Sequence, residues 1–115
     1  MIIRVWNGWA DTQEAAAAYA ELVNGTIAPG ILDRGIPGLR ELAVLRRRPE
    51  EHPGHFATLM TFDDWAAVEE FAGPGGTGSV VPPAARALLS RFDEHSAHFE
   101  LLGSHVRRSD RTAAP

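Results

Sequence analysis

Two residues near the end of the chain could carry proton chemistry. His98 and Glu100 alternate in a strand-like segment, so their side chains share one face. Histidine exchanges protons near neutral pH, which makes His98 a candidate proton acceptor. The alternative is an ion-pair or hydrogen-bond network at a subunit interface, with Arg4 near Glu100 if the last strand pairs with the first. The sequence leaves both interpretations open.

Asn7 is the second candidate for catalysis. The other members of its strand face are apolar: Ile3, Val5 and Trp9. A polar group among such neighbours needs hydrogen-bond partners. These could be backbone groups, or an enol or carbonyl oxygen of a ligand that Asn7 positions. We therefore expect a pocket on this face, and we expect Arg4 and Trp6 on the opposite face, covered by a partner subunit.

Large side chains on the predicted helices could shape that pocket. We take them as candidate substrate-binding residues: Tyr19, Val23, Trp65 and Phe71. The same side chains would equally suit a closed core, because apolar residues at helical spacing pack in either setting.

The remaining motifs favour ordinary structural roles. Residues 73–78 match G-x-G-x-x-G, but the run follows a helix and not a strand, so it predicts a loop, compatible with a flap over a pocket. His52 and His55, like His95 and His98, are three apart, which points strand side chains to opposite faces and does not preset a metal site. We expect no metal and no other cofactor.

Composition narrows the class of protein. The chain has 115 residues, enough for one domain with a modest core, since 44% are hydrophobic. A net charge of −4 argues against a nucleic-acid groove, and the absence of cysteine excludes disulfides and thiol chemistry. Strand-like residues begin at the first positions without a signal peptide, and no apolar run approaches the roughly 20 residues of a membrane span. We expect a cytoplasmic protein.

The spacing of apolar residues predicts the elements that must position these groups. Strands are predicted at residues 2–9, 39–48, 55–62 and 95–102, the third of them central. Helices are predicted at 12–23, ended by Asn24-Gly25, after Asp63 or Asp64, and from Pro82 to Phe92. This order is typical of an α+β, ferredoxin-like βαββαβ fold with an antiparallel four-stranded sheet. We expect residues 1–106 to form the domain and 107–115 a flexible tail.

Several short motifs together resemble a known family. They are Ile3-Arg4-Val5-Trp6-x-Gly8, Pro29-Gly30, Ile36-Pro37-Gly38, Phe62-Asp63-x-Trp65-Ala66-Ala67-Val68-x-x-Phe71-Ala72-Gly73, and His98-Phe99-Glu100. Over residues 2 to 102 the chain resembles the antibiotic biosynthesis monooxygenase family of dimeric α+β barrels.

The resemblance implies a homodimer with a ligand pocket between sheet and helices in each subunit. It implies a cofactor-independent monooxygenase that acts on an aromatic or polyketide-like substrate, whose anion reacts with oxygen itself. Asn7 would position a substrate oxygen and His98 would accept a proton. Asn7 also resembles an asparagine of a haem-degrading branch, but Phe71 replaces that branch's tryptophan and no histidine lies between Phe71 and Ser90. The alternatives are a non-oxidative cyclase or isomerase, and a non-catalytic ligand-binding dimer.

Overall fold

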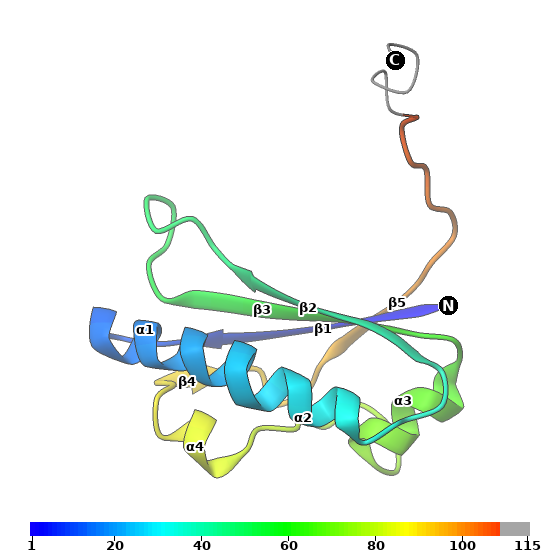
Figure 1. Cartoon of the computed structure of the whole chain (residues 1–115), viewed down its shortest axis with the longest axis horizontal. Coiled ribbons are helices and arrows are strands. Elements are labelled where there is room, and N and C mark those ends of the chain that lie inside the picture. Colours follow the sequence, from blue (N-terminus) through cyan, green and yellow to red (C-terminus); the bar gives the residue numbers. More distant parts are fainter. Residues whose placement is uncertain (109–115) are drawn as a thin grey trace.

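A computed structural model describes residues 1–108 as one antiparallel sheet with helices on one face (Figure 1). The strands are β1 (Ile2–Trp9), β2 (Leu39–Arg46), β3 (His55–Phe62), β4 (Arg91–Phe92) and β5 (Ala97–Glu100). The helices are α1 (Gln13–Leu22), the π-helix η1 (Val23–Ile27), α2 (Ala28–Asp33), α3 (Trp65–Ala72) and α4 (Pro83–Arg86). The sheet order is β2-β3-β1-β4, with β5 also paired to β1. The predicted ferredoxin-like α+β fold is confirmed.

The centre of the sheet is formed by β1 and β3, which pair along their whole length from Ile2↔Phe62 to Trp9↔His55. Both strands have the predicted bounds, and β3 is central as expected. The last strand does pair with the first, the condition on which a contact between Arg4 and Glu100 depended, since β5 lies against the first half of β1. In that register, however, Arg4 is opposite His98, and Glu100 is opposite Ile2.

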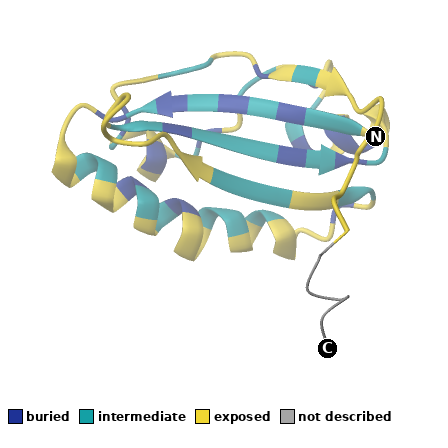
Figure 2. Cartoon of the chain, turned by 90° about the horizontal axis from the view of Figure 1, so that it is seen from above, coloured by how far each residue is buried: buried dark blue, intermediate teal, exposed yellow. Residues whose placement is uncertain are grey.

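The prediction of which face of β1 meets the helices was wrong. Arg4 and Trp6 face the helices, and both are buried, with exposed fractions of 3% and 8%. Ile3, Val5 and Asn7 face the other way and are half-buried, which gives the alternation along the strands in Figure 2. The sequence was ambiguous because each face carries apolar groups and one polar residue. On the helix side the indole N–H of Trp6 donates to Oγ of Ser79 and to the carbonyl of Asp93, at 3.2 and 3.0 Å.

The first helical segment runs on where a stop was predicted. The side chain of Thr12 caps α1 by accepting a hydrogen bond from the N–H of Ala15 at 3.0 Å. At Asn24-Gly25 the helix widens into η1, in which Ala28 donates to the carbonyl of Val23. A wider turn makes room for the ring of Pro29, which has no N–H to donate. The helix therefore continues through α2 instead of ending.

The predicted third helix is only one turn long. It ends with α4, and the next residues form β4 at the free edge of β1. The backbone N–H of Ser90 donates to the carbonyl of Trp9 at 2.7 Å, and that of Asp93 donates to the carbonyl of Asn7 at 2.9 Å. Pairing with β1 thus replaces the helical bonds that the apolar spacing favoured.

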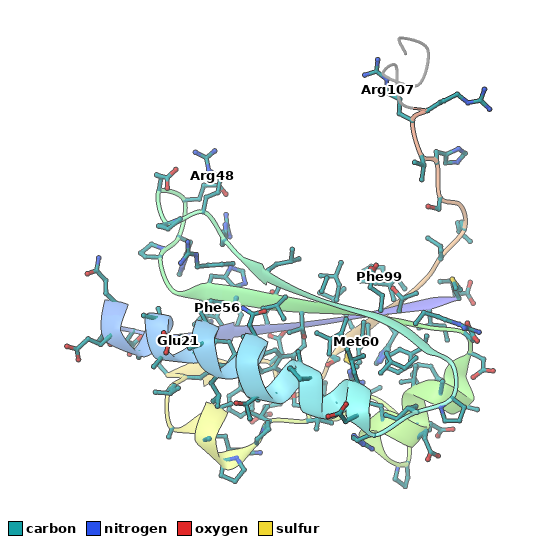
Figure 3. All side chains as sticks on the ribbon, in the orientation of Figure 1. Glu21, Arg48, Phe56, Met60, Phe99 and Arg107 are labelled. Carbon is teal, nitrogen blue, oxygen red and sulfur yellow. The ribbon has the colours of Figure 1, made fainter. Side chains whose placement is uncertain are left out.

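The core lies between the sheet and the helices and has two parts. One surrounds Trp6, Tyr19 and Phe56 beneath α1, and the other surrounds Phe62 and Val68 beneath α3. In Figure 3, Phe56 and Met60 mark the helix side of β3, and Phe99 marks the opposite side of the sheet. Within residues 1–108 no helix is long and apolar enough to cross a membrane. Most of the predicted tail, residues 109–115, lies outside the described residues.

Candidate ligand cavity

A cavity opens between the helices and the sheet. Its floor includes Trp6, Leu42 and Met60 of the sheet, its wall includes residues of α1, η1 and α2, and residues 80–82 and Ala85 close one side. The cavity is small, with a volume of about 50 Å³. A few water molecules fit this space. A polycyclic ligand therefore requires the wall to move outward.

Three of the predicted substrate-binding residues line this cavity. Tyr19, Val23 and Phe71 contribute to its walls, whereas Trp65 does not. Trp65 is 37% exposed and packs over Gly76, whose φ of +73° and close approach to the indole leave no room for a side chain. Trp65 therefore packs on the loop after α3 and not on the cavity. Substrate binding by these four residues stays a prediction.

Tyr19 presents a neutral hydroxyl to the cavity. The residue is 2% exposed, and its ring meets Phe56 edge-on with 4.9 Å between centroids. Burial raises the pKa of Tyr19 to about 12, because the phenolate would lose its hydration. Its hydroxyl makes no hydrogen bond to the described part of the chain. Tyr19 is thus available as a hydrogen-bond donor to a ligand.

Arg4 brings a buried cation to the same cavity. Its guanidinium donates to the carbonyls of Gly76 and Gly78 at 2.5 and 2.7 Å, which fixes the loop after α3. The guanidinium also lies 5.3 Å from the ring centroid of Phe71. Burial lowers the pKa of Arg4 by desolvation. No carboxylate among residues 1–108 forms an ion pair with it. The charge is therefore held by backbone carbonyl dipoles and the ring of Phe71, without a counter-ion in the described chain.

His98 lies beside Arg4 on the helix face, and not on the open face of the sheet. Its Nε2 is 3.0 Å from Nη1 of Arg4, and its ring meets Trp65 edge-on at 4.8 Å. Because arginine can only donate, Nε2 of His98 is the acceptor and carries no proton. Burial first, and then the charge of Arg4, lower the pKa of His98. His98 is therefore a neutral base whose acceptor nitrogen is occupied by Arg4.

Asn7 lies outside the cavity, on the open face of the sheet. Its Nδ2 donates to Oδ2 of Asp93 at 2.9 Å, and its Oδ1 accepts from Nε2 of His55 at 2.9 Å. Trp9 stacks on His55 at 4.7 Å, and the guanidinium of Arg91 lies 3.9 Å from the ring of Trp9. The arrangement holds β4 against β1. The catalytic role of Asn7 stays a prediction, and it could be exerted only from this face.

Ser96 is a polar residue of the cavity that sequence reasoning missed. It is 7% exposed, lines the cavity, and its Oγ is fully buried without a hydrogen-bond partner among residues 1–108. Its backbone N–H donates to the carbonyl of Thr77 at 2.8 Å, which ties it to the same loop that Arg4 holds. A serine before a short strand resembles an ordinary turn residue, so no pattern marked it.

The described part of the chain contains no group of three or more histidine, aspartate or glutamate side chains arranged to hold an ion. His52 and His55 come near each other in the β2–β3 turn, with ring centroids 5.9 Å apart, but no third such ligand joins them there.

Comparison with known proteins places the fold. No family model and no curated protein matches the sequence. Among solved structures, SnoaB, a cofactor-independent oxygenase from Streptomyces nogalater, matches at 22% identity and a TM-score of 0.61, over 90% of this chain and 94% of SnoaB. ActVA-Orf6, a monooxygenase of Streptomyces coelicolor in complex with nanaomycin D, matches at 15% identity and a TM-score of 0.61, over 93% and 92% of the two chains.

A third structure, a dimeric ferredoxin-like protein from an uncultured marine organism, matches at 7% identity and a TM-score of 0.63, over 93% of this chain and 92% of that one. At these identities the likeness concerns the fold and not the reaction. The chain has the ferredoxin-like fold that is shared by the antibiotic biosynthesis monooxygenases of known structure.

Proposed function

We propose that this protein is a small-molecule enzyme, a cofactor-independent monooxygenase acting on an aromatic, polyketide-like substrate. The observation that carries the proposal is the cavity between helices and sheet, apolar over most of its surface and furnished with Arg4, Tyr19 and Ser96. An apolar enclosure with a few placed polar groups is the usual form of a small-molecule site. Support comes also from the shared fold, since SnoaB is a cofactor-independent oxygenase and ActVA-Orf6 binds nanaomycin D.

The reaction needs little from the protein beyond binding, proton transfer and exclusion of water. A phenol that loses its proton becomes electron-rich enough to reduce oxygen. One oxygen atom replaces hydrogen on a ring carbon, giving a quinone, and the other leaves as water, so the substrate supplies all four electrons. Tyr19, held in its neutral form, would donate a hydrogen bond to the ionised ring oxygen. The apolar walls would keep bulk water from the anion.

His98 is the proposed proton acceptor. It is neutral, as a base must be, because burial and Arg4 lower its pKa. Its Nε2 becomes available only when Arg4 releases it, so proton uptake is coupled to a shift of the guanidinium. Asn7 would contribute from the open face, through its bonds to His55 and Asp93.

We further propose that the open sheet face forms a homodimer. Apolar side chains gather there on four strands: Ile3, Val5, Leu45, Leu59 and Phe99. Leu45 and Phe99 are 46% and 57% exposed in the single chain. An apolar face of this extent favours a partner, and one matched structure is a dimeric ferredoxin-like protein. Sedimentation of Leu59→Asp should give a monomer, and Leu32→Asp on the exposed face of α2 should not.

The narrowness of the cavity favours a second candidate, a non-catalytic dimer that only binds a small ligand. A non-oxidative cyclase or isomerase on a similar substrate is the other alternative, and it needs the same room as the monooxygenase. These use the same walls without oxygen. Oxygen uptake separates the candidates, measured with a panel of phenolic polyketides beside product analysis with and without air. Oxygen consumption with a quinone product supports the monooxygenase. Product formation without oxygen supports the cyclase or isomerase, and no conversion of any compound refutes an enzyme for this substrate class.

Variants connect the activity to the site. Tyr19→Phe and His98→Gln should lower turnover, and Asn7→Ala tests the open face. Asn24→Ala is a matched control for Asn7, because Asn24 is exposed on η1 and bonds only the carbonyl of Ala20. His105→Gln is the control for His98, because His105 is exposed. Equal loss in a variant and its control would argue against the assignment.

A further inference from the structure

One end of the cavity holds polar groups with hydrogen-bonding capacity that the rest of the described chain leaves unsatisfied. A guanidinium has five N–H donors in a fixed fork. In Arg4, Nη1 donates to Gly76 and meets His98, and Nη2 donates once, to Gly78. Its Nε–H and one N–H of Nη2 make no hydrogen bond to residues 1–108. Two donors of a buried cation are therefore left over.

Ser96 adds an independent observation at the same cavity. The residue is only 7% exposed, and its Oγ is fully buried without a hydrogen-bond partner among residues 1–108. A buried hydroxyl without a partner is unfavourable, because its lost hydration is not replaced unless a ligand or water pairs with it. Ser96 and Arg4 both line the cavity, and both are joined to the loop of residues 76–78. Because both residues contact this short loop, they lie together, at what we call the Arg4–Ser96 end of the cavity.

The positive charge of Arg4 favours a negatively charged ligand at this end of the cavity. A buried cation is normally paired, because its desolvation is unfavourable without a counter-charge. The protein supplies such pairing elsewhere: Nε and Nη2 of the exposed Arg40 hold both carboxylate oxygens of Asp63, at 2.7 and 2.5 Å. Arg4 lacks an equivalent acid in the described chain, so a ligand is the natural source of one.

We propose that the Arg4–Ser96 end of the cavity binds the carboxylate of an aromatic acid, whose apolar body lies against Tyr19 and Val23. Two guanidinium donors and one hydroxyl match the two oxygens of a carboxylate better than the single oxygen of a phenolate. The carboxylate would fix the orientation of the ring in the cavity. This inference rests on the proposed function only in taking the cavity as the ligand site, and it names the class of compound that the site selects.

Calorimetric titration near neutral pH with three probes of similar size tests the inference. The probes are benzoate, benzamide, which has the same shape without charge, and 4-nitrophenolate, whose charge lies on a phenol oxygen. Benzoate should bind at least about 10-fold more tightly than benzamide, the effect of one strong charge-assisted bond. None of the probes needs oxygen or turnover, so a failed monooxygenase assay leaves this result unaffected.

Variants assign the effect to the two residues. Arg4→Gln should weaken benzoate binding by about 10-fold or more and change benzamide binding by less than about 2-fold. Ser96→Ala should weaken benzoate binding by about 3-fold and keep the fold, because Oγ has no partner to lose. Arg34→Gln is the matched control: Arg34 also lies over Phe71, at 5.4 Å, and bonds backbone carbonyls, but it does not line the cavity.

Several results would overturn the inference. Equal binding of benzoate and benzamide would show that the charge is not recognised. Full benzoate affinity in both Arg4→Gln and Ser96→Ala would leave Arg4 as a structural clamp for the loop. Tighter binding of 4-nitrophenolate than of benzoate, lost in Arg4→Gln, would replace the carboxylate by a phenolate. No binding of benzoate at millimolar concentration would refute the site.

Discussion

The ionisation of Tyr19 gives a direct physical test of the cavity, because it is the single tyrosine of the chain. Phenolate absorbance in the near ultraviolet therefore reports one residue. Burial raises the pKa of this tyrosine from 10.0 to about 12. The difference of 2 units corresponds to about 2.7 kcal/mol, the extra free energy needed to charge the hydroxyl inside the protein.

A pH jump measures this before the protein can unfold. At pH 11 a group with a pKa of 12 is about 9% ionised, whereas one with a pKa of 10 is about 91% ionised. Folded protein brought rapidly to pH 11 should show the small initial change, followed by the full change as the chain unfolds. The chain in guanidinium chloride should show the full change at once, which is the control.

The raised pKa of Tyr19 also predicts how the free energy of unfolding changes at alkaline pH. The raised pKa means that the folded state holds the proton more firmly, so this contribution is complete below pH 10 and is lost as the pH rises from 10 to about 12. Within that window the free energy of unfolding should fall by about 1.4 kcal/mol per pH unit from Tyr19. Tyr19→Phe should remove that slope. An immediate, nearly complete ionisation at pH 11 with native circular dichroism would refute the buried hydroxyl.

Three other predictions concern folding and stability. Asp64→Ala removes the cap that accepts from the N–H of Ala67 at 2.9 Å, and urea denaturation should show a loss of about 1 kcal/mol, with little change in Asp11→Ala. Gly54→Ala should destabilise the protein by at least about 1–3 kcal/mol in the same assay. The reason is that φ of Gly54 is +79° and an added Cβ would lie 2.1 Å from the carbonyl oxygen of Ala10. Unaltered stability would contradict the described turn. His98→Gln should reduce the loss of stability below about pH 6.5, since the lowered pKa of His98 favours the unfolded, protonated form there, and an unchanged pH profile would count against it.

Local patterns were sufficient for the two central strands and for the starts of two helices. The bounds of β1 and β3 follow from runs of β-branched and aromatic residues, and Thr12 and Asp64 mark the beginnings of α1 and α3. Tyr19, Val23 and Phe71 reach the cavity because helical periodicity gives their face once the start is known.

Such patterns could not predict which face of β1 meets the helices, since each face carries apolar groups and one polar residue. Arg4 is acceptable inside only because residues 76 and 78 bring carbonyl oxygens to it from far along the chain. Asn7 is satisfied on the open face because Asp93, the residue after β4, accepts a hydrogen bond from its side chain. Both facts depend on contacts between residues more than 70 positions apart, which the spacing of neighbours does not contain.

The attachment of the loop after α3 has a consequence for how this protein could diversify. Arg4 holds the loop through the carbonyl oxygens of Gly76 and Gly78, which every amino acid possesses. Positions such as Pro74 and Thr77 are exposed and can therefore change without loosening this anchor. Natural drift or a designed library could vary these exposed positions and leave the attachment of the loop to β1 intact, so the outer surface of the loop can evolve separately from the stability of the fold.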